Sequence, residues 1–112
     1  AFWAWQYDAY DNFAIWNAHD TELRYLADYT AERDIRLIVV IFPNMADPTG
    51  SVPYVDRVAQ VFDGYDHVEV LKLFDDVAEW GVEASIVSVR DTHPNAAFHR
   101  YVGNRLYELY FQ

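Results

Sequence analysis

The spacing of apolar residues along the chain predicts several helices. An apolar stripe at helical spacing indicates an amphipathic helix over about residues 13–33. A second helix is expected over residues 53–64, because the first turn of a helix tolerates the proline at its start and the glycine at its end is a common stop signal. A third helix is expected from Pro94 onward, with Thr92 or His93 near its N-terminal cap.

Three other apolar segments predict β-strands. Residues 36–42 are β-branched and barely alternate with polar residues, which is typical of a strand buried on both faces. Residues 67–71 and 85–88 are expected to form a second and a weaker third strand, with a short helical or irregular segment over residues 74–80. The proline-rich stretch 43–53 is expected to be a loop. This alternation predicts an α/β fold, namely a partial three-layer α/β/α arrangement with a short parallel sheet of the flavodoxin-like kind.

The ends of the sequence bear on its origin. A sheet of three strands is thin for this architecture, so part of the domain is expected to lie outside the sequence. The first residue is Ala1 rather than methionine, and no basic-then-apolar signal segment follows it. We therefore expect the sequence to begin inside a longer gene product. Residues 109–112 match the end of a common protease-cleavable purification tag and are expected to be a tag remnant.

Composition and charge exclude several classes of partner. Of the 112 residues, 53% are hydrophobic and 23% are charged, which is typical of a globular domain. The 18 acidic and 8 basic residues give a formal net charge of −10, so nucleic acids and anionic membrane surfaces are poor partners. No apolar run approaches the ~18 residues that a membrane span needs. The absence of cysteine excludes disulfides, thiolate metal sites and cysteine nucleophiles, and it leaves the cellular compartment undecided.

The segment before the last predicted helix carries the most reactive side chains. Sites in parallel α/β sheets form where loops leave the carboxyl ends of strands, and Asp91 and His93 are expected in such a loop. A carboxylate two residues before a histidine can hold the imidazole in one tautomer and stabilise the imidazolium that forms when the ring accepts a proton. The pattern favours a general base that is oriented by an aspartate. The alternative is a pair of polar residues that caps the helix.

This segment also resembles part of a known family. The run Asp-Thr-His-Pro-Asn at 91–95, followed by His99 and by Gly-Asn-Arg-Leu-Tyr at 103–107, is similar to the last conserved block of the SGNH (GDSL-type) hydrolases. That block supplies the catalytic Asp and His of the family. The resemblance therefore implies that His93 is the general base and that Asp91 is its orienting carboxylate.

The resemblance extends upstream but does not reach a nucleophile. The helix and strand patterns are similar to those of the family's C-terminal half, so residues 1–108 are expected to be the C-terminal portion of an SGNH-like hydrolase domain. Many members place the Asp three residues before the His, where this chain has Arg90, while others share the spacing found here. The family's nucleophile lies in a Gly-Asp-Ser block that this sequence lacks. None of Ser51, Ser85 and Ser88 follows a predicted strand in a turn that would present a nucleophile.

Three interpretations of function follow. The resemblance implies a serine ester hydrolase, an acyl or acetyl esterase, whose nucleophile lies outside the sequence. It would act on a small-molecule or carbohydrate ester with no metal and no organic cofactor, and its activity would rise with pH as His93 becomes neutral. The alternative is a non-catalytic binding or interaction module derived from the same family. A fragment, the third interpretation, predicts an exposed strand edge at residues 37–42, with self-association or pairing with a missing N-terminal half.

Other polar and aromatic residues are expected to have structural or surface roles. His99 points away from His93 on the predicted helix, so we expect a structural hydrogen bond rather than a metal site with two histidines. The aromatic residues over 2–13 are expected to pack a core, with a sugar-stacking platform as the alternative. Asn44 follows the buried strand and is expected to line a pocket. Solvated surface positions are expected for His19, Asp20, Asp63, His67, Asp75 and Asp76.

Overall fold

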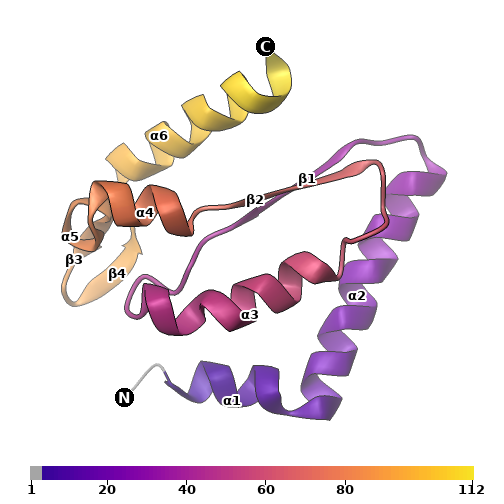
Figure 1. The fold of residues 1–112 in the computed structure, drawn as a ribbon, viewed down its shortest axis with the longest axis horizontal. Helices are drawn as coiled ribbons and strands as arrows, with labels where there is room; N and C mark the ends of the chain where they lie inside the picture. The colour runs from indigo at the N-terminus through magenta and orange to yellow at the C-terminus, as the bar shows by residue number, and fades with distance from the viewer. Residues whose placement is uncertain (1–3) are drawn as a thin grey trace.

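The structure is a computed structural model that describes residues 4–112 (Figure 1). Phe2 and Trp3, two of the expected N-terminal aromatic residues, lie outside the described residues. The elements, in chain order, are α1 (Trp5–Asp11), α2 (Phe13–Glu32), β1 (Leu37–Ile41), α3 (Pro48–Gln60), β2 (Val68–Lys72), α4 (Phe74–Trp80), α5 (Val82–Ser85), β3 (Ile86–Ser88), β4 (Asp91–Pro94), α6 (Ala96–Leu106) and the π-helical turn η2 (Tyr107–Phe111).

β1 and β2 form a parallel two-stranded sheet, connected through α3. The register pairs Leu37 with Val68 at the start of the strands. At this end the backbone N–H of Leu37 donates to the carbonyl of His67, and at the other end the N–H of Leu73 donates to the carbonyl of Ile41, each at 3.1 Å. The two strands lie where the hydrophobic pattern predicts them, and their parallel pairing is the one expected from helix–strand alternation.

A hydrophobic cluster lies on each face of this sheet, because alternate residues of a strand point to opposite faces. Val40 and Phe42 pack with the cluster that includes Phe98 and Val102 of α6. Leu37 and Val39 pack with the other cluster, which includes Ala27 of α2 and the residues Val61 and Phe62 after α3. In Figure 1, α6 lies above the two strands and α3 lies below them. Helices on both sides of a short parallel sheet confirm the predicted partial α/β/α arrangement.

The third predicted strand forms as β3, but the prediction that it joins the parallel sheet is wrong. β3 pairs with β4 in a separate antiparallel sheet, in which Ile86 is opposite Pro94 and Ser88 is opposite Asp91. The chain reverses directly after β3, because the Ser88 hydroxyl accepts hydrogen bonds from the N–H groups of Arg90 and Asp91 at 3.3 and 3.1 Å. This turn brings β4, the next segment of the chain, alongside β3. β3 therefore pairs with β4 and does not join β1 and β2.

The predicted loop over residues 43–53 is also wrong in its second half, because α3 begins at Pro48 rather than at Pro53. Asp47 caps the helix by accepting a hydrogen bond from the N–H of Gly50 at 3.2 Å, and Pro48 occupies the first helical turn. A Cβ atom at Gly50 would lie 1.9 Å from the Asp47 carboxylate, so a larger residue there would displace this carboxylate from its present position. The cap and the first proline therefore set the start of the helix, while Pro53 lies inside it.

The molecule is flat. Its principal extents are 42 × 40 × 17 Å, and its radius of gyration of 15.2 Å exceeds the roughly 13 Å expected of a compact domain of this length. Many large apolar side chains are consequently exposed, among them Phe13, Tyr25, Val87, Val89, Tyr107 and Phe111. None of the helices within residues 4–112 is both long enough and apolar enough to cross a bilayer.

Candidate active site

The β3–β4 hairpin carries the predicted site residues, and Asn95 fixes it to α6. The side-chain oxygen of Asn95 accepts a hydrogen bond from the N–H of Phe98 at 2.8 Å, which caps α6. Its amide nitrogen donates to the carbonyl of Ala84 at 2.8 Å and to that of Ile86 at 3.1 Å. The cap that was expected at Thr92 or His93 is therefore Asn95, whose side chain joins α6, α5 and the start of the hairpin.

Asp91 and His93 form a hydrogen-bonded pair on β4. The Asp91 Oδ1 lies 2.5 Å from Nδ1 of His93, and the same oxygen accepts the backbone N–H of His93 at 3.1 Å. The two residues were expected in a strand-to-helix loop, but they lie in a strand, where residues two apart share a face. The strand conformation thus produces the contact that the loop was expected to produce.

The charge of Asp91 is stabilised by this contact. The hydrogen bond from the His93 ring, followed by the one from the His93 backbone, lowers the pKa of Asp91 from its usual value. When Nδ1 donates to the carboxylate, Nε2 of the neutral ring becomes the acceptor. The His93 side chain is 87% exposed, and no group within residues 4–112 forms a hydrogen bond with Nε2. The pair can therefore accept a proton at an accessible nitrogen.

The three serine hydroxyls have structural roles. The Ser51 hydroxyl donates to the carbonyl of Pro48 at 2.8 Å, and the Ser85 hydroxyl donates to that of Gly81 at 2.8 Å. Both serines are buried, and Ser88 stabilises the hairpin turn. None of the three contacts His93 among the described residues, so none is placed as a nucleophile.

Clefts lie near the carboxyl end of β1. Asn44 lines a cleft of about 260 Å³ together with Tyr7, Tyr10 and Tyr54, which confirms its expected position at a pocket. A neighbouring cleft of about 370 Å³ is lined by residues that include Lys72, and a third, of about 240 Å³, lies against α1 and α2. Asp91 and His93 line none of these three clefts. Tyr7 and Tyr10 belong to the aromatic residues noted over 2–13, whereas the sequence had no signal for Tyr54 in the first cleft.

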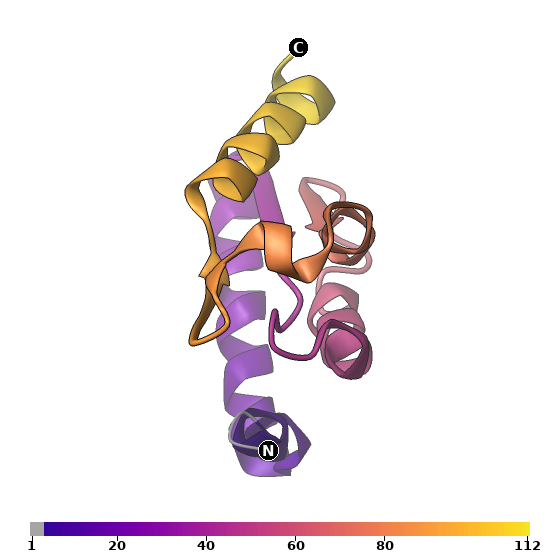
Figure 2. The same ribbon diagram turned by 90° about the vertical axis from the view of Figure 1, so that its left-hand side faces the viewer.

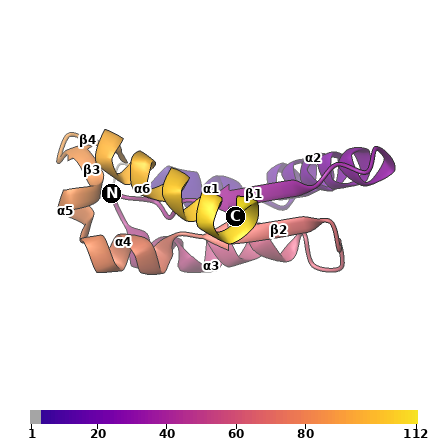
Figure 3. The same cartoon turned by 90° about the horizontal axis from the view of Figure 1, so that it is seen from above.

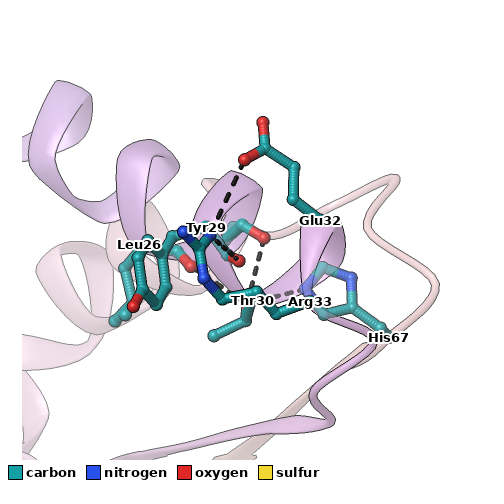
Figure 4. Close-up of polar contacts among 7 residues, drawn as sticks. Leu26, Tyr29, Thr30, Glu32, Arg33 and His67 are labelled. Carbon is teal, nitrogen blue, oxygen red and sulfur yellow. Dashed lines mark hydrogen bonds and ion pairs between the residues drawn. The ribbon is translucent and has the colours of Figure 1, made fainter.

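Four surface predictions need correction. Asp20 is half-buried and forms an ion pair with Arg24 at 3.1 Å. His67 is half-buried, and its Nε2 lies 2.9 Å from the Thr30 hydroxyl of α2 (Figure 4). His19 is also half-buried, with its ring edge-on to those of Tyr10 and Trp16. Thr30 and Tyr10 belong to other segments of the chain, so the local sequence could not reveal these contacts. Trp16 lies three residues before His19 on α2, and only this partner follows from helical spacing.

The fourth correction concerns Asp76, which is 3% exposed. Its Oδ1 accepts a hydrogen bond from the Tyr101 hydroxyl at 2.6 Å and forms an ion pair with Arg105. Tyr101 and Arg105 are one turn apart on α6, and that spacing was the only signal in the sequence for a shared partner. Asp75 is exposed as predicted.

The structural hydrogen bond that was expected for the His99 side chain is not found among the described residues. Its ring lies 5.9 Å from the ring of Phe42, between centroids, and is exposed. Within residues 4–112 no group of three His, Asp or Glu side chains could hold a metal ion.

The end of the chain contacts the rest of the molecule. The carbonyl of Tyr110 accepts a hydrogen bond from Arg36 at 2.7 Å, and the Tyr110 ring packs against the cluster under α6. The origin of residues 109–112 stays a prediction.

Comparisons with known proteins identify no relative. No protein-family model, no curated protein and no solved structure matches the chain.

Proposed function

We propose that this chain is part of a serine ester hydrolase of the SGNH type, an acyl or acetyl esterase. His93 is the general base, Asp91 orients it, and the nucleophilic serine comes from outside residues 1–112. The observation that carries the proposal is the 2.5 Å contact between Asp91 and Nδ1 of His93, with the rest of the ring exposed to solvent.

The chemistry follows from this contact. When the serine oxygen attacks the ester carbonyl, its proton passes to Nε2 of His93, and the ring becomes an imidazolium. Asp91 remains ionised and stabilises the positive ring, which is consistent with its lowered pKa. The protonated ring then returns the proton to the leaving alcohol.

A second candidate is a non-catalytic binding module. The structural roles of Ser51, Ser85 and Ser88 favour it, because no serine hydroxyl among the described residues is available to attack an ester. The cleft beside Asn44 would be its binding surface.

The test is hydrolysis of p-nitrophenyl acetate by the full-length protein and its variants. The variant His93→Ala should lower kcat by about 10³-fold or more, because groups that act as a unit lose most of their effect when one is removed. Asp91→Asn should also lower kcat strongly with little change in KM. The matched control is His99→Ala, which removes an exposed ring six residues away and should leave kcat unchanged.

The pH profile provides a further measurement. The lowered pKa of Asp91 keeps this carboxylate ionised as pH falls, so the loss of activity on the acid side should follow a single protonation, that of His93. A His93→Ala protein that keeps most of its turnover would rule out His93 as the general base, whereas absence of hydrolysis by the unmodified protein would favour the binding module.

A further inference from the structure

β1 uses only one of its two edges among the described residues. In a parallel ladder the N–H and C=O of one residue point to the same side, and alternate residues point to opposite sides. Leu37 and Ile41 bond toward β2, so Val39 does as well. The backbone groups of Ile38 and Val40 therefore point to the other edge, where residues 4–112 provide no strand.

The two clusters of the core determine which side chains fit at this edge. β1 is covered on one face by α6 and on the other by α2, and all five of its residues are half-buried. A strand added at the edge would lie between the same two layers of helices. It would therefore need apolar side chains on both faces, as strands of covered parallel sheets have.

The position of the edge disfavours a second copy of this chain. Figures 2 and 3 show that the β3–β4 hairpin and the start of α6 extend further than β1 on the side away from β2. Two such recessed edges would bring these projecting elements together before the strands could pair. Each copy would also carry a formal charge of −10.

We infer that the outer edge of β1 receives an apolar β-strand, parallel to β1, from a polypeptide segment outside residues 1–112. The parallel direction rests on the proposed function, which needs further groups beside His93. The hairpin with Asp91 and His93 stands at the carboxyl end of β1, on the side of the unpaired edge (Figure 3). The chain that leaves a parallel strand would enter the site there, as at the carboxyl ends of strands in α/β sheets.

Amide hydrogen exchange of the chain, measured residue by residue by NMR, tests the edge. In dilute solution the N–H groups of Ile38 and Val40 should exchange faster than those of Val39 and Ile41. The probe is a short synthetic peptide with a central Val-Ile-Val-Val-Ile stretch and lysines at both ends. At saturation it should slow exchange at Ile38 and Val40 by about tenfold or more. A peptide with proline at its centre is the control and should have no such effect.

Two variants separate the edge from the fold. Val40→Pro removes an N–H that points away from β2, at a position where an edge strand tolerates proline, and should abolish the effect of the peptide. Val39→Pro removes a bond of the β1–β2 ladder and should instead destabilise the chain. If Val40→Pro leaves the peptide effect intact, the inference is wrong.

A spin label at the carboxyl end of the peptide tests direction. Parallel binding should broaden the signals of the hairpin residues around His93, whereas broadening near Arg36 would overturn the parallel orientation. Absence of protection by the peptide would overturn the docking itself, and protection that grows with chain concentration alone would identify a second copy as the occupant. The peptide carries no serine, so these outcomes do not depend on ester hydrolysis, and the two proposals can fail separately.

Discussion

Replacement of Asn95 by alanine tests how the hairpin is held. The side chain of Asn95 accepts one hydrogen bond as the cap of α6 and donates two others, to the carbonyls of Ala84 and Ile86. Asn12 provides a matched control, because it caps α2 through a bond from the N–H of Ile15 at 3.2 Å, the one hydrogen bond of its side chain among the described residues. A comparison of the two alanine variants therefore isolates the two donated bonds.

The expected free energies follow from these contacts. Loss of an N-terminal cap lowers the free energy of unfolding by about 1 kcal/mol. Each of the two further bonds of Asn95 contributes about 0.5–1.5 kcal/mol, with the more exposed bond to Ala84 at the lower end. Asn95→Ala should then destabilise the chain by about 2–3 kcal/mol and Asn12→Ala by about 1 kcal/mol. Asn95→Asp should fall between them, because it keeps the cap and loses both donors.

Urea denaturation, followed by circular dichroism, provides the free energies of unfolding from the midpoint and slope. Equal losses for Asn95→Ala and Asn12→Ala, to within about 0.5 kcal/mol, would refute the role of Asn95 as a connector of α6 with the hairpin. The Asp91–His93 contact can be followed in the same variants through the NMR signals of the His93 ring, which should shift only when the hairpin is released.

Two other predictions concern the core and a tyrosine. Phe98 of α6 is fully buried, so Phe98→Ala should lower the free energy of unfolding by about 3–5 kcal/mol. Phe13→Ala, at an 82% exposed position, should change this free energy by less than about 0.5 kcal/mol. Burial, with the hydrogen bond to Asp47, raises the pKa of Tyr7 to about 12. Because the neutral phenol is the form that the fold stabilises, this contribution should be complete below pH 10 and be lost as pH rises toward 12. Tyr7→Phe should remove that late step from a tyrosinate absorbance titration.

The sequence predicted those helices and strands whose hydrophobic pattern extends over many consecutive residues. The continuous apolar run at residues 37–42 predicted β1, and the helical stripe over residues 13–33 predicted α2, which ends at Glu32. The short segment 85–88 was correctly predicted as a strand, but its place in the parallel sheet was wrong, because the three residues of β3 carry no signal for the strand with which they pair. Its partner was decided by the Ser88 turn, which hydrophobic periodicity does not report.

In the candidate site, too, some contacts could be predicted from the sequence and others could not. The Asp91–His93 contact was predicted from the spacing of two residues, although the strand β4 that produces it was not predicted. The contact of Thr30 with His67 and the burial of Asp76 were not predictable, because both join segments that are far apart in sequence. The same holds for the contact of Tyr7 in α1 with Tyr54 in α3 in the cleft beside Asn44.

The pair on β4 and the unpaired edge of β1 are best understood together. A hydrogen-bonded Asp–His pair needs only a short strand, so it can form without the rest of a site around it. An ester hydrolase also needs a nucleophile and donors for the developing oxyanion, and within residues 4–112 no residue in contact with His93 supplies them. Among the same residues β1 has no neighbour on the side where the hairpin stands, and its apolar faces are already covered by helices. A strand at that edge would extend both hydrophobic clusters and bring new groups to His93, so a single addition would serve both the sheet and the site.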